Sequence, residues 1–549
     1  MNRERLPLLF KNVNSDLSLL FATLCVIDIF GIFPIIALPR SIVQCGLYGI
    51  PLVFMVLALQ IYTAILLGKS WIIATTIDPQ ILRKNRNPLA AVTELTLGSR
   101  ARSLITIILD LTIFGCSIPN LLVASQNLQI FGLKISGQQF NLSFCYWLLI
   151  VGILLCPIMW LGSPRDMKII SLFSCTTVLL TALLIWWCII TDTRELDIIP
   201  ILTSPSWDKF ISSYGMLAFQ FDIHPTLMTV QVDMRHPQDI NKAVVISFLV
   251  TSSLFLITTI LAVWKYGSSI TANILQLIPG NFIMSIVVLI AALQLCLSSV
   301  LSHSTLFQDL EDQCNIKRNF GWKRCLIRSA IVFLGVAVGE SVPRFDIVMV
   351  LIGGSLTGLL VFVFPPLLYS KIIALKTKSK KIRSLIPEIY SSSERCQSSK
   401  DMSTNPRIHS KSIYYGVLNI PRTEYHRYSY VYYSELENKL DEIVNYENDI
   451  IDSEKFLMTK RIYNDKPIFI DASQPYNIYK QIITPEEPIS ESTIYYNYKK
   501  WNNCFNYLIV LFGIIITISS TYINMKNTIH YVQFTPPCII NVSILENSS

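Results

Sequence analysis

The sequence predicts an all-α polytopic membrane protein with about eleven transmembrane helices. Of its 549 residues, 52% are hydrophobic and only 15% are charged, and the mean hydropathy is +0.48. A soluble domain typically carries about 25% charged residues, and a soluble chain of this length would need more charge to cover its surface. This composition excludes a soluble enzyme, a nucleic-acid-binding domain and a disordered chain.

The charged residues are concentrated in one hydrophilic segment. Residues 371–503 hold 37 of the 82 charged side chains. A transmembrane helix needs about 20 mostly apolar residues; ten such runs precede this segment and one follows it. The runs are continuously apolar, which excludes β-barrel strands. The predicted spans are 18–39, 47–68, 103–129, 144–161, 169–190, 210–233, 243–264, 282–304, 325–340, 347–370 and 504–523.

Basic residues in the short loops predict that the N-terminus is cytosolic. With this orientation, the cytosolic segments before residue 371 hold 18 Lys and Arg residues, and the opposite side holds seven. Loops rich in Lys and Arg stay in the cytosol. The predicted parts are a cytosolic N-terminus (1–17), a ten-helix core (18–370), a cytosolic and largely disordered insert (371–503), an eleventh helix (504–523) and a luminal or extracellular tail (524–549).

The sequence shows no pattern that is typical of an enzyme or a metal site. The 13 cysteines form no CxxC pair, and most lie within apolar runs, where they act as small apolar residues. We find no nucleophile–base pattern, no metal-ligand spacing and no phosphate-binding glycine loop. The run Gly353-Gly354-Ser355 lies in an apolar stretch without a lysine, so it is interpreted as a packing or gating segment. We therefore expect no catalytic activity, no cofactor and no metal.

Helix-breaking residues interrupt the first and sixth predicted spans. The first contains Gly31 and Pro34, and the sixth places Asp222, His224 and Pro225 close together. Proline removes a backbone donor and clashes with the preceding turn, and backbone groups freed at membrane depth need new partners. Broken helices in corresponding positions of two halves indicate a transporter binding site. The pattern therefore predicts a five-plus-five inverted repeat followed by one extra helix.

Several short motifs together resemble the amino acid/auxin permease family over residues 18–370. They are Phe219-Gln220-Phe221-Asp222-Ile223-His224-Pro225, Met234-Arg235-His236-Pro237, Leu38-Pro39 with Gln44-Cys45-Gly46, Tyr62-Thr63 with Leu67-Gly68, Val342-Pro343-Arg344-Phe345 and Phe364-Pro365-Pro366-Leu367. The vesicular inhibitory amino acid and proton-coupled amino acid transporter branches are the most similar. The resemblance implies a leucine-transporter-type fold and secondary transport of amino acids. Two features depart from the family: Pro34 stands where it usually has a glycine, and the chain contains the insert 371–503.

An amino acid substrate would bring a carboxylate and an ammonium group to the broken spans. The unwound part of the first span offers backbone N–H groups to the carboxylate. We expect Gly31, Ile32, Phe33 and Pro34 to form this cradle, with Pro34 supplying only a carbonyl. In the sixth span, the candidate wall or ammonium contacts are Phe219, Gln220 and Asp222.

Two interpretations are open for the ionisable residues within the spans. His224 titrates near neutral pH when unperturbed, and it could form a proton relay with Asp222. Alternatively, His224 hydrogen-bonds a free carbonyl and stays neutral. Asp28 and Asp110 are further carboxylates inside predicted spans, and they either line the cavity or pair structurally.

Sodium coupling is the weaker alternative to proton coupling. It would need hydroxyl and carbonyl groups, which Ser298 and Ser302 of the eighth span could supply. Small hydroxyl residues are also ordinary packing residues between membrane helices. His303, near the cytosolic end of the same span, is expected to be interfacial.

Two function classes are favoured: a secondary active amino acid carrier, or a non-transporting amino acid sensor that signals through the insert. A channel, for which the sequence shows no ring of like charges, and a membrane enzyme are the weaker alternatives. The expected partners are an amino acid, a coupling ion and the lipid bilayer, and no nucleic acid. Two motifs resemble signals for cytosolic sorting adaptors, which favours an endolysosomal or vesicle membrane over the plasma membrane. These motifs are Glu4-Arg5-Leu6-Pro7-Leu8-Leu9 and Tyr415-Gly416-Val417-Leu418.

Overall fold

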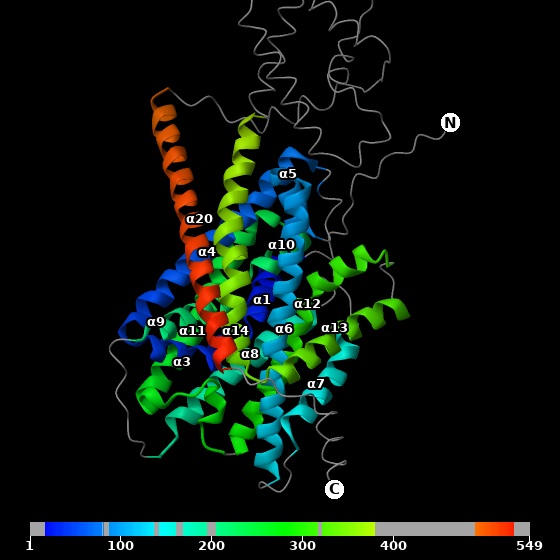
Figure 1. The fold of residues 1–549 in the computed structure, drawn as a ribbon, viewed down its shortest axis with the longest axis vertical. Coiled ribbons are helices and arrows are strands. Elements are labelled where there is room, and N and C mark those ends of the chain that lie inside the picture. Colours follow the sequence, from blue (N-terminus) through cyan, green and yellow to red (C-terminus); the bar gives the residue numbers. More distant parts are fainter. Residues whose placement is uncertain are drawn as a thin grey trace, which may run out of the picture. The chain divides into compact units, whose positions relative to one another are not determined.

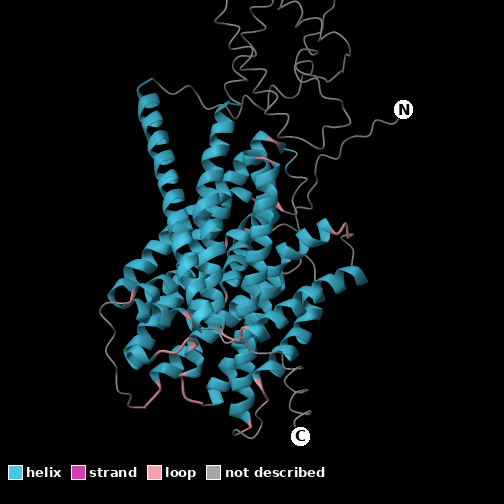
Figure 2. Ribbon diagram, in the orientation of Figure 1, coloured by secondary structure: helices cyan, strands magenta, loops and turns pink. Residues whose placement is uncertain are grey.

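The computed structural model describes residues 17–79, 81, 87–136, 142–160, 168–194, 205–280, 282–316, 321–378 and 489–531. These residues are nearly all helical, and the part described contains no strand beyond an isolated bridge between Leu17 and Met234 (Figure 2). The chain divides into two compact units, of which the first comprises Met1–Thr93, Arg100–Ser370 and Asn506–Ser549. Both sorting-like motifs and most of the predicted insert lie outside the described residues.

Fifteen α-helices among the described residues are used below (Figure 1). They are α1 (Leu19–Phe30), α2 (Phe33–Ile36), α3 (Leu38–Cys45), α4 (Gly49–Ile77), α5 (Pro88–Leu97), α6 (Ser99–Ile135), α7 (Phe144–Met159), α8 (Lys168–Ile190), α9 (Trp207–Gln220), α10 (His224–Asp233), α11 (Ile240–Tyr266), α12 (Phe282–Gln313), α13 (Trp322–Ser341), α14 (Phe345–Ile352) and α20 (Ile489–Tyr531). Two π-helical stretches continue α14, namely η8 (Gly353–Thr357) and η9 (Leu359–Val363).

Seven helical stretches in the described part of the chain are long and apolar enough to cross a membrane. They are Leu38–Ile77, Ser99–Ile135, Ile169–Ile190, Pro237–Ser269, Phe282–Gln313, Phe345–Lys378 and Cys504–His530. The other four predicted spans are not among these seven. The first and sixth are interrupted, the fourth corresponds to α7, which has only 16 residues, and the ninth corresponds to α13. The chain therefore has several membrane-spanning helices, while the total of eleven and the inverted repeat stay predictions.

Glycine and proline end and restart the helices of the two interrupted spans. Gly31 ends α1 with a φ of 59°, a left-handed backbone that favours glycine. Pro34, Pro39 and Pro225 each lie in the first turn of the following helix, namely α2, α3 and α10. A proline there costs no helical hydrogen bond, because the first turn has no acceptor for its N–H. Both interruptions that the sequence predicts thus occur in the structure.

The interrupted first span lies at the centre of the first unit. Its α1 contacts α8, α11 and α12, and these helices surround it in Figure 1. Most of its side chains are accordingly buried, and they include Ala22, Cys25 and the carboxylate of Asp28. A polar group in this position has no water to hydrogen-bond, so it must find its partners on the neighbouring helices.

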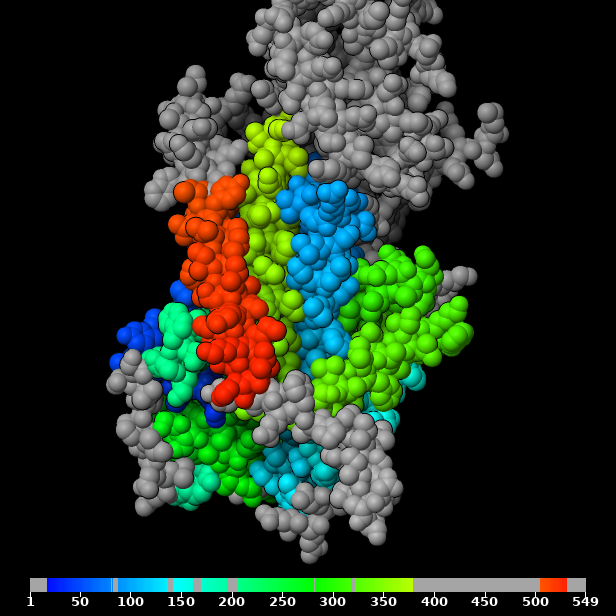
Figure 3. Space-filling view, viewed as in Figure 1, coloured from blue at the N-terminus to red at the C-terminus, as the bar shows by residue number. Residues whose placement is uncertain are grey.

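The glycine run of the tenth span makes close helix contacts, which supports the predicted packing role, while the gating role stays a prediction. A Cβ atom on Gly354 would collide with Ser520 of α20, and one on Gly358 would collide with Thr517. Figure 3 shows α20, in orange and red, directly beside the yellow-green tenth span. Close approach of this kind is typical of small residues between membrane helices. The α20 helix extends beyond the predicted span 504–523 at both ends.

Candidate substrate and ion site

The two helix interruptions lie next to each other. The Phe30 ring, at the end of α1, meets the Phe221 ring, just after α9, with centroids 5.8 Å apart. Both rings also contact Phe248 of α11, at 4.9 Å and 6.1 Å. The breaks are therefore brought together by an aromatic cluster. The structure places the residues of both predicted binding segments around one region of the protein.

The backbone of the first interruption is mostly hydrogen-bonded already. The N–H of Gly31 donates to the carbonyl of Ile27 at 3.0 Å. The N–H of Ile32 donates to the side-chain oxygen Oε1 of Gln294 at 3.1 Å. The Phe33 N–H has no partner among the described residues, and Pro34 has no N–H. The predicted cradle is thus present as backbone, but its Ile32 donor is occupied by a glutamine side chain.

Gln294 is a site residue that the sequence analysis missed. Its side chain is fully buried, and its Nε2 lies 3.4 Å from Ser174 Oγ of α8. The Ser174 hydroxyl in turn donates to Asp28 Oδ1. The signal that could have identified Gln294 is its position within the apolar run Ala291–Leu297, since an amide at membrane depth needs partners.

Asp28 is the acceptor at the end of these hydrogen bonds. It is fully buried, and its Oδ2 has no partner within the described part of the chain. Ser298 Oγ donates to the backbone carbonyl of Asp28 at 2.6 Å, which links α12 to α1. Ser302 is half-buried one turn further along and has no such bond to α1. Only one of the two predicted serines therefore reaches the interruption.

The second interruption holds an aspartate–histidine pair. Asp222 Oδ1 accepts from the backbone N–H of His224 at 3.1 Å and lies 3.2 Å from His224 Nδ1. His224 Nε2 lies 3.0 Å from Thr63 Oγ1 of α4. The side chains of Asp222 and His224 are at most 1% exposed, and Asp222 Oδ2 has no partner among the described residues.

This hydrogen-bond geometry accommodates both protonation states of His224. A neutral ring can donate from Nδ1 to Asp222 and accept at Nε2 from the Thr63 hydroxyl. A protonated ring can donate from both nitrogens, because the Thr63 hydroxyl can instead donate to the Leu59 carbonyl at 2.9 Å. Both the relay interpretation and the neutral interpretation therefore remain compatible with the geometry.

The remaining predicted contacts of the sixth span lie just before its interruption. Gln220 is buried, with Nε2 3.8 Å from the sulfur of Met349 on α14. Phe219 is also buried, and its Cβ lies against Gly353. The carbonyl of Ala218 accepts from Gln60 Nε2 of α4 at 2.9 Å. These contacts connect the sixth span to the tenth and the second.

Asp110 belongs to a different group of side chains. Its carboxyl interacts with that of Asp309 on α12. Asp309 also accepts from Asn87 Nδ2 at 3.0 Å and from Gln313 Nε2 at 2.6 Å. None of these partners belongs to either interruption, so Asp110 is not joined to Asp222 or Asp28 by the hydrogen bonds described above.

His303 is enclosed by protein, and its expected position at the membrane interface stays a prediction. Its side chain is 3% exposed, its Nδ1 lies 2.6 Å from the Ser299 carbonyl, and its ring stacks on Phe307. An imidazole fits the interior here because the backbone carbonyl of its own helix satisfies one nitrogen and an aromatic ring covers its face.

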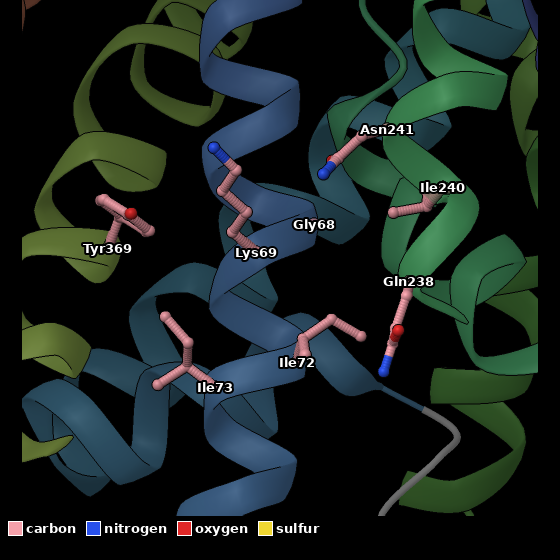
Figure 4. Close-up of a pocket in the computed structure, with 8 residues that line it drawn as sticks. All are labelled: Gly68, Lys69, Ile72, Ile73, Gln238, Ile240, Asn241 and Tyr369. Atoms are coloured by element: carbon pink, nitrogen blue, oxygen red, sulfur yellow. The ribbon is translucent and has the colours of Figure 1, made fainter. Parts of the chain in front are cut away.

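A separate cavity of about 220 Å³ lies away from both interruptions. Figure 4 shows its lining residues, which are Gly68, Lys69, Ile72, Ile73, Gln238, Ile240, Asn241 and Tyr369. None of the predicted site residues lines it. The interruptions themselves are closed by packed side chains, since most of their residues are buried. This cavity is therefore not the candidate substrate site.

Comparisons with known proteins give the family of the chain. Residues 20–390 match the family described as transmembrane amino acid transporter protein. Three relatives come from Arabidopsis thaliana. Amino acid transporter AVT1C is 22% identical over 351 residues, AVT1B is 23% identical over 296, and AVT1D is 21% identical over 372. The matches cover 62%, 52% and 63% of this chain and 61%, 53% and 62% of the respective relatives.

The fold is similar to that in a crystal structure of MhsT in complex with L-phenylalanine, with 14% sequence identity and a TM-score of 0.43. The similarity covers 64% of this chain and 87% of the MhsT chain. The chain spans about three fifths of the length of the relatives AVT1C and AVT1D. The family match itself covers well over half of the 549 residues. The chain belongs to the transmembrane amino acid transporter family, which is a family of transporters and not of enzymes.

Proposed function

We propose that the protein is a secondary active transporter of amino acids, coupled to protons, with its substrate site at the two helix interruptions. The observation that carries this proposal is the contact between the breaks, where the Phe30 and Phe221 rings meet at 5.8 Å. Paired interruptions leave backbone donors and carbonyls that a zwitterionic substrate can use. The family and the named amino acid transporters among its relatives support the substrate class.

The two buried carboxylates support coupling to a proton. Asp28 and Asp222 each have one oxygen without a partner among the described residues. A charged group inside a membrane protein is costly unless it is paired or takes part in function. A proton removes that cost without the set of oxygen ligands that a metal ion requires. Sodium coupling is the alternative, and it would need oxygen ligands in addition to Ser298 and Ser302.

The proposed roles divide between the two interruptions. The backbone of Gly31, Ile32, Phe33 and Pro34 receives the substrate carboxylate, and Phe219, Gln220 and Asp222 of the sixth span face its ammonium group and side chain. His224 and Asp222 carry the coupling proton at the second interruption, and Asp28 carries it at the first. Asp110, whose partners lie elsewhere, is a weaker candidate.

Uptake into proteoliposomes tests this proposal. The full chain is reconstituted in sodium-free buffer, and labelled amino acids are supplied with and without an inward proton gradient. Uptake should follow the gradient, and it should fall at least about tenfold in His224→Ala and Asp222→Asn, because each change removes one member of a buried pair. His236→Ala and Asp208→Asn are matched controls, since both residues are exposed and lie outside the interruptions.

The alternative outcomes separate the competing functions. Gradient-dependent uptake that persists in both variants would refute the role of the sixth-span pair. Saturable binding of an amino acid without uptake would support the sensor that signals through the insert. If none of the labelled amino acids is bound or taken up, the proposal that the substrate is an amino acid is refuted. We further propose a cytosolic N-terminus and an endolysosomal or vesicle membrane, which immunolabelling of intact and permeabilised cells would test.

A further inference from the structure

A continuous set of hydrogen bonds connects the first interruption to Asp28. The Ile32 N–H donates to Gln294 Oε1 at 3.1 Å, and Gln294 Nε2 donates to Ser174 Oγ at 3.4 Å. The Ser174 hydroxyl then donates to Asp28 Oδ1. The side chains of all three polar residues are fully buried. Each of these three donors therefore points toward the Asp28 carboxylate.

The direction of these hydrogen bonds depends on the charge of Asp28. An ionised carboxylate can only accept, a serine hydroxyl has one proton to donate, and an amide has a donor end and an acceptor end. With Asp28 ionised, the Ser174 proton must point to Asp28, so Gln294 presents its NH₂ group to Ser174. Its carbonyl oxygen is then free to accept from Ile32. The amide orientation in the structure, with its oxygen toward the Ile32 N–H, is compatible with an ionised Asp28.

Adding a proton to Asp28 Oδ1 reverses this order. The new O–H donates to Ser174 Oγ, and the Ser174 hydroxyl then donates to the side-chain oxygen of Gln294. For Ser174 to donate to it, the amide of Gln294 turns over, which places its NH₂ group opposite the Ile32 N–H. Two donors cannot form a hydrogen bond, so the Ile32 N–H is released. One proton enters in this step, and no covalent bond other than its O–H bond forms or breaks.

Gly31 leaves the space in which the Gln294 amide can turn. A Cβ atom at this position would lie 3.1 Å from Gln294 Nε2 and 3.4 Å from its Oε1. Both distances are tight, so a larger residue would press on the amide in either orientation. The glycine thus has two uses: it adopts a φ of 59° that ends α1, and it leaves room beside the interruption.

We propose that Gln294 is a positioning residue that couples the charge of Asp28 to the backbone of the first interruption. Proton binding at Asp28 releases the Ile32 N–H, which then receives the substrate carboxylate; this last step rests on the proposed function. The result is positive coupling between proton and substrate, because each favours the same orientation of Gln294.

The other groups around Asp28 are neutral among the described residues. The titratable ones are the thiols of Cys25 on α1 and Cys175 on α8, and the Cys175 thiol contacts the Leu24 carbonyl at 3.0 Å. The α12 helix presents Gln294 and Ser298, and α11 presents the Ser247 hydroxyl, which donates to the Thr23 carbonyl. Asp28 is therefore the group whose charge can set the direction of the hydrogen bonds.

Hydrogen exchange of the peptide that contains Ile32 tests the switch without any substrate. The full chain is purified in detergent, and exchange is followed by mass spectrometry. Asp28→Asn supplies an amide that can donate to Ser174, as a protonated carboxyl does, so exchange should rise about fivefold through loss of one hydrogen bond. Gln294→Met, which has no strong acceptor, should do the same. Ser171→Ala is the matched control, because Ser171 is a buried serine of α8 whose Oγ has no partner among the described residues.

A second measurement covers the case in which a variant does not fold. The unfolding temperature of each variant is recorded, and exchange of the wild type is compared at pH 5 and pH 8 after correction for the intrinsic rate. We expect faster corrected exchange in the Ile32 peptide at the lower pH. Unchanged exchange in folded Asp28→Asn, or in the wild type across this pH range, would overturn the proposal.

Amino acid binding at different pH values separates this proposal from the proposed function. Wild-type affinity should rise about fivefold as the pH falls, whereas Gln294→Met should bind with little pH dependence and Ser171→Ala should match the wild type. Binding of Gln294→Met with the full wild-type pH dependence would overturn the coupling role and leave transport standing. A change in exchange without binding of any amino acid would overturn the transport function and leave the switch standing.

Discussion

Replacing Gly31 with alanine perturbs the first interruption at its most constrained point. Gly31 has φ 59° and ψ −151°, a region of backbone space that residues with a side chain rarely adopt. A Cβ atom there would also lie 3.1 Å from Gln294 Nε2 and 3.3 Å from Ser298 Oγ. Gly31→Ala therefore strains the backbone and displaces Gln294 at the same time.

The two effects of Gly31→Ala can be estimated separately. Holding a non-glycine residue in this backbone region costs about 1–3 kcal/mol. Moving Gln294 weakens its hydrogen bond to the Ile32 N–H, which is worth about 1 kcal/mol. The free energy of unfolding should thus fall by about 2–4 kcal/mol. The unfolding temperature should fall by about 5 °C or more, because each kcal/mol shifts it by about 2–4 °C in a medium-sized domain.

Thermal unfolding in detergent and uptake into proteoliposomes measure both consequences. Gly335→Ala is the matched control, because Gly335 lies within the continuous helix α13 and its added Cβ would meet only the Leu121 side chain at 3.3 Å and Ser117 Oγ at 3.7 Å. Alanine is the better helix former at such a position by about 1 kcal/mol. The control should therefore keep its unfolding temperature and its uptake.

A Gly31→Ala protein with the unfolding temperature and uptake of the wild type would refute this reasoning. It would mean that the backbone around residue 31 can relax to an ordinary conformation without loss. A lower unfolding temperature combined with normal uptake would contradict only the part of the reasoning that concerns Gln294. Equal losses in Gly31→Ala and Gly335→Ala would show that neither the positive φ nor the interruption is the cause.

Three further changes test other parts of the structure. Gly353→Ala should prevent stable folding, measured as loss of the monodisperse detergent-solubilised protein, because its Cβ would collide with a backbone carbonyl of α9. Thr63→Val should lower the rate of uptake about tenfold, since it removes the hydroxyl that lies 3.0 Å from His224 Nε2. Hydrogen bonds from Arg194 lower the pKa of Asp192 to about 2, so this pair stabilises the fold above about pH 4 and loses its effect as the pH falls toward 2. The unfolding temperature of Asp192→Asn should accordingly lie below that of the wild type at pH 7, and the difference should shrink below about pH 4.

Two of these changes, Thr63→Val and Asp192→Asn, have a matched control in the same protein. Thr112→Val removes a buried hydroxyl that donates only to the Ile108 carbonyl of its own helix, so it should keep its uptake. Asp208→Asn alters an exposed carboxylate and should show no difference from the wild type at either pH. A folded Gly353→Ala protein would contradict the close packing of α9 on η8. A pH-independent difference for Asp192→Asn would contradict the role of its charge.

The interruptions could be predicted from the sequence because their causes are local. Gly31, Pro34 and Pro225 impose their backbone preferences on neighbours within one turn, so a single run of residues is enough to locate each break. The packing role of the glycine run in the tenth span follows in the same way from the small size of its members. Such predictions need no knowledge of the rest of the chain.

The partners that fill an interruption could not be predicted, because they depend on distant residues. Gln294 and Ile32 are 262 positions apart, and Ser174 and Asp28 are 146 apart. The burial of His303 has the same origin, since its surroundings come from the packing of several helices. The length of α20 was also underestimated, because its polar ends lack the apolar run used to define a span.

The two carboxylates at the interruptions differ in the charge of their surroundings. Asp222 lies 3.2 Å from His224 Nδ1, and a protonated imidazole can neutralise it without any change at the carboxylate. Asp28 has only neutral donors around it among the described residues, and Ser174 is the one that reaches its carboxyl group. An ion pair can remain buried in a membrane protein, whereas an isolated carboxylate there needs a cation of its own. We therefore expect the coupling proton to depend more strongly on Asp28 than on Asp222, even though the sixth-span pair is the more conspicuous feature of the sequence.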